Sequence, residues 1–292
     1  MAVLDVDIAV YQVAISCERE KDLKVVKETM DLYLRDWLAI TSSAKYVGYI
    51  TDSKTNFRLK RATTWPYKGQ RKADKPKWHS AMRQYVQEKW GVQNVVGIEA
   101  DDALTISSEI LKSLGYIPII VTEDKDLLQY PCLHYNPNKS QHVFEVTPEE
   151  AHYNLWQQVI TGDRVDNIPG VSHAITESTL GSYNRNISSL DLPHEEKMKL
   201  FRKYPLQEQF GPATASKYLN QFEPEEYALK VWELYVDKYE DPEDEGSEGY
   251  GDLRFYETFD LIYMLLVAPE GVEVLVEPRD SPAPEGIQFL EF

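Results

Sequence analysis

Residues 99–126 read EADDALTISSEILKSLGYIPIIVTEDKD, and this stretch decides the fold. Apolar residues recur at helical spacing from Ala103 to Leu114, and Gly115 is the residue type that ends a helix. The run from Ile117 to Val121 is continuously apolar, as in a strand of a parallel sheet covered by helices on both faces. A helix that leads into a buried strand predicts a β–α–β architecture.

The same alternation of strand and helix patterns extends through the first half of the chain. A strand-like run, MAVLDVDIAV, opens the sequence, a helical pattern follows near Leu23 to Leu38, and KYVGYIT (residues 45–51) reads as the next strand. The segment after Pro148 reads as mostly helical, and LIYMLLVA (residues 261–268) fits a buried strand or helix. We found no internal repeat. The pattern predicts an α/β fold, a parallel twisted sheet flanked by helices, with a helical C-terminal part.

Length and composition indicate a globular protein. With 292 residues and 42% hydrophobic content, the chain can bury a substantial core. Cys17 and Cys132 are far apart and have no metal-binding spacing, so we expect free thiols in a reducing compartment. No apolar stretch approaches ~18 residues and the N-terminus lacks a basic leader, which predicts a cytoplasmic protein (host cytoplasm if phage-encoded) with no membrane partner.

The formal net charge of −17 is distributed very unevenly. Residues 223–292 hold 20 acidic and 4 basic side chains, so the C-terminal quarter carries most of the imbalance. Residues 54–89 hold 11 basic side chains against Asp74 and Glu88. Phe57, Trp65, Tyr67 and Trp78 alternate with these cations, and aromatic rings beside cations are typical of a surface that binds single-stranded nucleic acid. A solvated amphipathic segment is the alternative.

Acidic residues follow the predicted strands. Asp5, Asp52, Glu99 and Asp124 each stand at or just beyond the end of a strand-like run. Side chains at the carboxyl ends of parallel strands converge on one crevice, so we expect these four to become neighbours. Further acids accompany them: Asp101 and Asp102 in E-A-D-D, Asp126 in E-D-K-D, and Asp163 and Asp166 in G-D-R-V-D-N.

Converging carboxylates repel one another unless cations neutralise them. Hard oxygen ligands favour Mg²⁺ or Mn²⁺ over zinc. Two such ions about 4 Å apart activate water and stabilise the leaving oxygen, which is the chemistry of phosphodiester hydrolysis. An aspartate at a helix start is more often a helix cap, and for Asp102 taken alone we favour that reading.

The ordered motifs together resemble one known family. D-V-D, T-D-S, Y-K-G-Q-R-K, E-A-D-D, E-D-K-D and G-D-R-V-D-N-I-P-G-V occur in the order found in the flap-endonuclease superfamily, with bacteriophage 5′-to-3′ exonucleases and the nuclease domains of bacterial DNA polymerases I most similar. The resemblance covers approximately residues 1–222. It implies a PIN-like fold with a helical arch and an enzyme that cleaves DNA at 5′ ends, flaps or nicks, and RNA–DNA hybrids as well, in phage-type replication or repair.

The resemblance also implies roles for individual residues. Two Mg²⁺ ions, replaceable by Mn²⁺, would be held by two sets of acids: Asp5, Asp52, Glu99, Asp101 and Asp102 for the first, and Asp124, Asp126, Asp163 and Asp166 for the second. Asp7 matches an additional acid of some phage members, but as a metal ligand we place it below the others. Lys68, Arg71 and Asp101 would act in the reaction, and nucleic acid would be bound by Arg58, Tyr67, Lys68, Arg71, Lys72 and Lys217.

We expect three regions. The resemblance implies residues 1–150 as the α/β core with the arch at 54–90 and residues 151–236 as a helical duplex-binding part, whereas composition alone marks 237–292 as an acidic loop and C-terminal segment. A family hairpin that binds duplex DNA, often with K⁺, would follow D-N-I-P-G-V directly. Here the matching F-G-P-A-T-A-S-K-Y-L, with Gly211 and Ala215, comes about forty residues later. Residues 172–209 then form an insertion, or V-S-H-A-I-T-E-S-T-L is itself a degenerate hairpin.

Two other functions are open at this point. A PIN-type ribonuclease would share the acidic crevice but lacks the basic arch and the extension after G-D-x-x-D-N. A non-catalytic DNA-binding replication protein would account for the acidic C-terminal part but not for the nearly complete acid set. His79, His142 and His173 are best read as ordinary surface or supporting residues, since metal-bound hydroxide removes the need for a general base.

Overall fold

The computed structural model describes residues 1–52, 54–69, 74–140, 142–171, 193, 210–240 and 247–282. The chain divides into two compact units. The first comprises Met1–Phe57, Lys72–Ala151 and Met264–Phe292, and the second comprises Arg58–Arg71 and His152–Tyr263. None of the helices in the described ranges combines the length and the apolar character needed to cross a bilayer.

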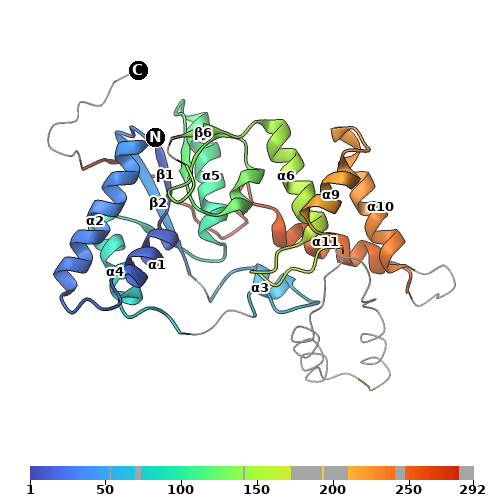
Figure 1. Ribbon diagram of the computed structural model, residues 1–292, viewed down its shortest axis with the longest axis horizontal. Coiled ribbons are helices and arrows are strands. Elements are labelled where there is room, and N and C mark those ends of the chain that lie inside the picture. Colours follow the sequence, from blue (N-terminus) through green and yellow to red (C-terminus); the bar gives the residue numbers. More distant parts are fainter. Residues whose placement is uncertain are drawn as a thin grey trace. The chain divides into compact units, whose positions relative to one another are not determined.

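The first unit is a mostly parallel sheet flanked by helices, as predicted (Figure 1). Its strand order is β3-β2-β1-β4-β5-β6, and β7 pairs with the edge of β2. The strands are β1 (Ala2–Asp5), β2 (Lys45–Thr51), β3 (Gln93–Val95), β4 (Ile119–Val121), β5 (Leu133–Tyr135), β6 (Phe144–Glu145) and β7 (Arg279–Asp280). Strands β3, β2, β1, β4 and β5 pair in parallel, whereas β6 and β7 pair antiparallel.

Helices cover both faces of this sheet because successive strand residues point to opposite sides. Leu4 faces one apolar cluster with α1 (Val6–Ser16), α2 (Leu23–Ile40) and α4 (His79–Trp90), whereas Val3 faces a second cluster. The second cluster contains α5 (Ala100–Ser113) and apolar residues of the C-terminal segment. A short 3₁₀ helix, η1 (Lys125–Gln129), follows β4.

A segment that we call the C-terminal strap, residues 264–282, belongs to this first unit. It contains no helix, and it bends at residues 266–267 and turns at residues 270–271 before it reaches β7. Val272, Val274 and Val276, at every second position, pack against the α5 side of the sheet. Gln93 fixes the strap by donating to the Glu273 carbonyl (3.2 Å) and accepting from the Leu275 backbone N–H (2.8 Å).

The second unit is helical throughout its described elements. These are α3 (Arg58–Arg61), most of α6 (Pro148–Thr161), α9 (Pro212–Leu219), the 3₁₀ helix η2 (Pro224–Glu226), α10 (Tyr227–Tyr239) and α11 (Tyr250–Ile262). An aromatic-rich core that includes Trp156, Tyr235 and Phe255 holds them together. The prediction of a mostly helical segment after Pro148 is confirmed up to Ile262 for the described residues, whereas residues 263–282 contain no helix.

The structure corrects two expectations about element boundaries. The strand at the N-terminus ends at Asp5, and α1 begins at Val6 instead of continuing the strand. The side chains of α1 that face the core are so uniformly apolar that a helical period is hard to see in them. At the other end, α11 ends at Ile262, so residues 263–268 are neither strand nor helix.

Candidate active site

Three of the predicted acids lie at the same edge of the sheet in the first unit. Asp5 is the last residue of β1, Asp52 follows β2 directly, and Asp124 comes shortly after β4. Since β1 pairs in parallel with both β2 and β4, the carboxyl ends of these strands share one edge. The convergence predicted from strand order therefore has a structural basis in the register of the sheet.

Asp5 is the most deeply buried of these three acids, with 3% of its surface exposed. One of its oxygens, Oδ2, accepts a hydrogen bond from the Thr122 hydroxyl (2.9 Å), and that hydroxyl accepts from the backbone N–H of Asp124 (3.0 Å). Burial raises the pKa of Asp5 to about 8, with the negative charges of Asp7 and Asp124 adding to the rise. An ionised Asp5 is thus costly here unless a positive charge comes near it.

Asp124 and Asp126 lie together at the start of η1. Asp124 caps this helix, since its Oδ1 accepts from the backbone N–H of Asp126 (2.9 Å). The Asp126 carboxylate forms an ion pair with Lys125 (3.6 Å). The short helix holds the two aspartates of E-D-K-D beside one another after β4.

Glu99 and Asp102 form a capping box at the start of α5. Each side chain accepts from the other residue's backbone N–H, and the Glu99 N–H to Asp102 Oδ2 distance is 3.1 Å. The other Asp102 oxygen accepts from the backbone N–H of Leu265 (3.1 Å). Asp102 is fully buried. Both of its oxygens are bound by backbone N–H groups, in agreement with the helix-cap reading of this residue.

Asp7 is bound by protein groups as well. It accepts from the Thr51 backbone N–H (2.7 Å) and pairs with Arg83 of α4 (2.6 Å). Arg83 also donates to the Thr51 carbonyl (2.8 Å), next to Asp52. Sequence reasoning missed Arg83, because nothing in its spacing distinguishes it from the other cations of residues 54–89.

Asp101 lies in the first turn of α5. Asp163 and Asp166 belong to the second unit, in a tight loop after α6. Asp163 Oδ1 accepts from the backbone N–H groups of Val165 (2.6 Å) and Asp166 (3.0 Å). Gly162 and Gly170 close the loop with left-handed φ angles of 66° and 62°. A Cβ on Gly162 would lie 2.5 Å from the backbone nitrogen of Gly170, so the loop closure requires glycine there.

Tyr67 and Lys68 contact Asp166 directly. The Tyr67 hydroxyl donates to Asp166 Oδ2 (2.9 Å), and the Lys68 ammonium lies 3.4 Å from the same oxygen. The Lys68 backbone N–H donates to the Asp166 carbonyl (2.8 Å). Tyr67 is 6% exposed, and Lys68 lies over its ring. Base stacking by Tyr67 and phosphate binding by Lys68 stay predictions, and in this structure both residues are held on Asp166.

The other predicted nucleic-acid contacts differ in exposure. Arg58 is 1% exposed and donates to the carbonyls of Leu261 (2.9 Å) and Tyr263 (2.8 Å) at the end of α11. Lys217 is exposed on α9. Arg71 and Lys72 lie outside the described residues, as does the proposed insertion at residues 172–209 apart from Pro193.

The donor set has the right chemistry for a hard divalent cation but is not gathered into a complete cage. All the predicted ligands are carboxylates, the donors that Mg²⁺ and Mn²⁺ prefer. Within the described ranges, no group of three or more His, Cys, Asp or Glu residues has a geometry that could hold a metal ion. The feature of this structure that fits such an ion is Asp5, because its buried carboxylate needs a nearby positive charge to be ionised at low cost.

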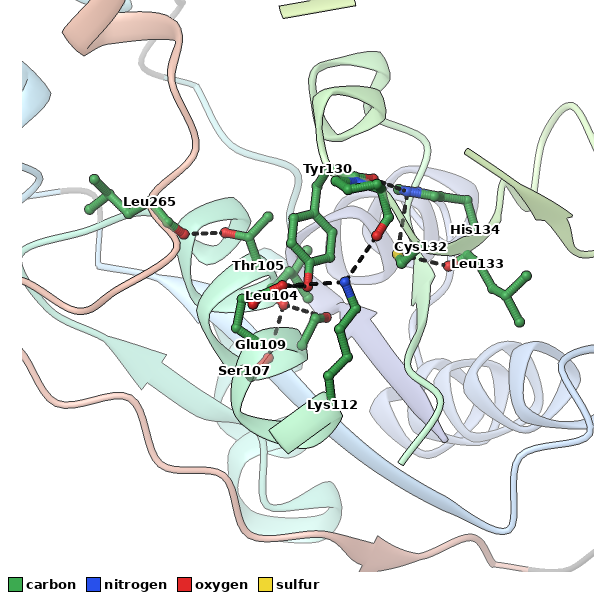
Figure 2. Close-up of polar contacts among 12 residues, drawn as sticks. Leu104, Thr105, Ser107, Glu109, Lys112, Tyr130, Cys132, Leu133, His134 and Leu265 are labelled. Carbon is green, nitrogen blue, oxygen red and sulfur yellow. Dashed lines mark hydrogen bonds and ion pairs between the residues drawn. The ribbon is translucent and has the colours of Figure 1, made fainter. Parts of the chain in front are cut away.

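A polar cluster at the far end of α5 is separate from these acids (Figure 2). Glu109 accepts from the Tyr130 hydroxyl (2.5 Å) and from Lys112 (3.2 Å), and Lys112 also donates to the Pro131 carbonyl (3.0 Å). Burial raises the pKa of the neighbouring Cys132 thiol to about 12, so it stays protonated and is no nucleophile. Cys17 and Cys132 are both free thiols, as expected.

Comparison with known proteins gives one sequence relative. The chain is 30% identical over 145 residues to the 5′-3′ exonuclease of Buchnera aphidicola subsp. Schizaphis graminum, a match that covers 44% of this chain and 49% of the relative. The chain thus spans about half the length of the curated relative it matches. No protein-family model matches the chain.

Solved structures with a similar course of the chain come from bacteriophage T5. The D15 protein co-crystallised with metal ions aligns with 89% of this chain and 97% of its own, at 14% identity and a TM-score of 0.46. A D15 flap endonuclease variant in complex with DNA and metal ions aligns at 13% identity and a TM-score of 0.45, covering 89% of this chain and 98% of that one. The identity to the Buchnera exonuclease confirms the resemblance of the sequence motifs to 5′-3′ exonucleases.

Proposed function

We propose that this protein is a divalent-metal-dependent 5′ nuclease that hydrolyses phosphodiester bonds at the 5′ ends of duplex DNA. The observation that carries the proposal is Asp5, whose buried carboxylate lies beside Asp7 and Asp124 at the edge where the parallel strands end. Buried carboxylates that raise one another's pKa are typical of sites that bind a cation for catalysis. The 30% identity to a 5′-3′ exonuclease supports the same reaction.

In this proposal two groups of acids hold two Mg²⁺ ions. Asp5, Asp52, Glu99 and Asp101 serve the first ion, and Asp124 and Asp126 serve the second together with Asp163 and Asp166. When bound, the ions supply a nucleophilic water and stabilise the charge on the leaving oxygen. The capping of η1 by Asp124 and of α5 by Glu99 orients these carboxylates before any ion binds.

Lys68 is proposed to bind the phosphate at the cleaved bond. Its present partner, Asp166, is an anion, and a DNA phosphate would offer the same charge in its place. The basic segment of residues 54–89, with 11 cations, would attract the DNA backbone to an otherwise acidic protein. Cleavage of RNA–DNA hybrids and a role in replication belong to this proposal as further expectations.

The test is a panel of single-stranded RNA and of nicked, flapped, blunt and RNA–DNA hybrid duplexes, each labelled at either the 5′ or the 3′ end. With Mg²⁺, we expect short products released from the 5′ end of DNA, and none in EDTA. Cleavage confined to single-stranded RNA would support a PIN-type ribonuclease instead. Tight DNA binding with no cleavage in Mg²⁺ or Mn²⁺ would support a non-catalytic binding protein.

A further inference from the structure

The C-terminal strap contacts the helix that carries two of the proposed metal ligands. The backbone N–H of Leu265 donates to Asp102 Oδ1 (3.1 Å), and the hydroxyl of Thr105 donates to the Leu265 carbonyl (2.5 Å; Figure 2). Both polar groups of the Leu265 backbone are thus bound to the first turns of α5. The preceding residue, Met264, donates its N–H to the side chain of Gln129 (3.0 Å).

Asp102 connects this strap contact to Glu99. Its second oxygen accepts from the Glu99 backbone N–H (3.1 Å), while the Glu99 side chain accepts from the Asp102 backbone. Asp102 is fully buried, and each of its oxygens is directed at a backbone N–H. A carboxylate held on both oxygens by backbone N–H groups keeps one orientation and fixes the residues bonded to it, as the hydrogen-bond partners of metal ligands do.

The rest of the strap is fixed to the first unit by further bonds, so the contact at Leu265 belongs to a segment that is held in place. The Tyr49 hydroxyl of β2 donates to the Leu275 carbonyl (2.8 Å), and β7 pairs with β2 at Lys45 and Tyr46. Apolar side chains of the strap, among them Val272, Val274 and Val276, pack on the α5 side of the sheet. The strap is therefore held at several points along its length.

We propose that Asp102 is a positioning residue, through which the C-terminal strap fixes the start of α5 and with it the carboxylates of Glu99 and Asp101. This inference rests on the proposed function, because it assigns Glu99 and Asp101 to a metal ion. It departs from the assignment of Asp102 as a ligand, and it makes a segment more than 150 residues away in sequence part of the site.

The experiment loosens the strap without changing an acid. Thr105→Val keeps the shape of the side chain but removes the hydroxyl that binds the Leu265 carbonyl. Ser113→Ala is the matched control, because that hydroxyl lies on the same helix and donates to the Ile110 carbonyl within α5 (2.6 Å) instead of to the strap. Asp102→Asn is the third variant. The asparagine oxygen can still accept from one of the two backbone N–H groups, but its NH₂ group cannot accept from the other.

Mn²⁺ binding without DNA is measured by titration calorimetry, and the Mg²⁺ concentration for half-maximal cleavage is measured alongside. We expect Thr105→Val and Asp102→Asn to weaken Mn²⁺ binding about ten-fold, the usual effect of losing a group that orients a ligand. Saturating Mg²⁺ should restore most of the cleavage rate. Ser113→Ala should match the wild type in both measurements.

Two results would overturn the inference. If Asp102→Asn lost one bound ion outright and no Mg²⁺ concentration restored cleavage, Asp102 would be a ligand. If Thr105→Val lowered the melting temperature but left Mn²⁺ affinity unchanged, the strap would support stability alone. A wild type that neither binds Mn²⁺ nor cleaves DNA would instead contradict the proposed function, and faster hydrogen exchange of the 100–104 amides in Thr105→Val would still test the strap contact.

Discussion

At the scale of single residues, the buried carboxyl of Asp5 makes stability depend on pH. Its carboxyl is buried at the end of β1 and has a pKa raised from 3.8 to about 8. The folded protein therefore binds a proton at Asp5 that the unfolded chain releases. Stability falls as the pH rises from about 4 to about 8, and above that range this residue adds no further pH dependence.

Asp5→Asn should accordingly stabilise the metal-free protein, because the amide mimics the neutral acid. In EDTA we expect the melting temperature of the variant to exceed that of the wild type at pH 8, with a smaller difference at pH 5. Mn²⁺ should raise the melting temperature of the wild type more than that of the variant. The exposed Asp36→Asn is the control, and an equal pH response in all three proteins would contradict the burial argument.

Lys68 is the residue for which binding and catalysis can be separated. Lys68→Ala removes the cation proposed to stabilise the transition state, so single-turnover cleavage should slow by about 10² or more. The dissociation constant for DNA should change by less than about three-fold, since many other cations bind the backbone. Lys60→Ala, an exposed cation on α3, is the control. A loss confined to affinity would make Lys68 a simple backbone contact.

At the scale of elements, α11 fixes the residues that lead to Tyr67. The buried Glu257 carboxylate accepts from the backbone N–H groups of Thr63 (2.6 Å) and Thr64 (2.7 Å) and pairs with Arg254 (3.0 Å). Arg254 also donates to the Thr64 hydroxyl. Together with Arg58, which caps the end of α11, these bonds hold residues 58–64 against one helix.

Glu257→Gln should therefore be strongly destabilising, because it removes the negative charge that lies 3.0 Å from the buried Arg254. We expect a loss of about 3–5 kcal/mol in the free energy of unfolding, measured by urea denaturation. Glu233→Gln breaks a partly exposed pair with Lys230 (2.9 Å) and should cost less than about 1 kcal/mol. Equal losses in the two variants would show that the buried network does not hold this segment.

The strand order and the helix boundaries show how far local patterns reach. The alternation of apolar runs predicted β2, α2, α5 and the helical second half, since each of these elements shows its pattern of apolar residues within one continuous stretch of sequence. It did not predict the strap, whose anchors at Tyr49, Gln93 and Asp102 come from distant parts of the sequence. Nor did it predict that Tyr67 would be buried, because burial depends on what packs against the ring.

The acids show the same difference between features that consecutive residues predict and features that depend on distant contacts. Asp5, Asp52 and Asp124 could be placed at one edge because they stand at or just beyond the ends of strands that pair in parallel. Asp7 and Asp102 resemble the others in sequence, yet their oxygens are taken by Arg83 and by the Leu265 backbone. Only the fold brings those partners close, so spacing alone cannot distinguish a ligand from a buried structural acid.

At the scale of the whole molecule, charge is divided between regions of opposite sign. The chain carries a net −17, while residues 54–89 hold 11 basic side chains against two acidic ones. Binding to DNA should therefore depend on this segment and weaken steeply with salt, because each phosphate contact releases counterions. A shallow salt dependence would place the binding surface elsewhere.

The proposed function depends on cation-assisted cleavage at the carboxyl ends of the strands. Asp124→Asn tests this most directly, on a 5′-flapped duplex with Mg²⁺ at saturating protein. The variant should lose cleavage, while its dissociation constant for the flapped duplex, measured in Ca²⁺ or EDTA, should stay within about three-fold of the wild-type value. Cleavage by Asp124→Asn at the wild-type rate would contradict the proposed function.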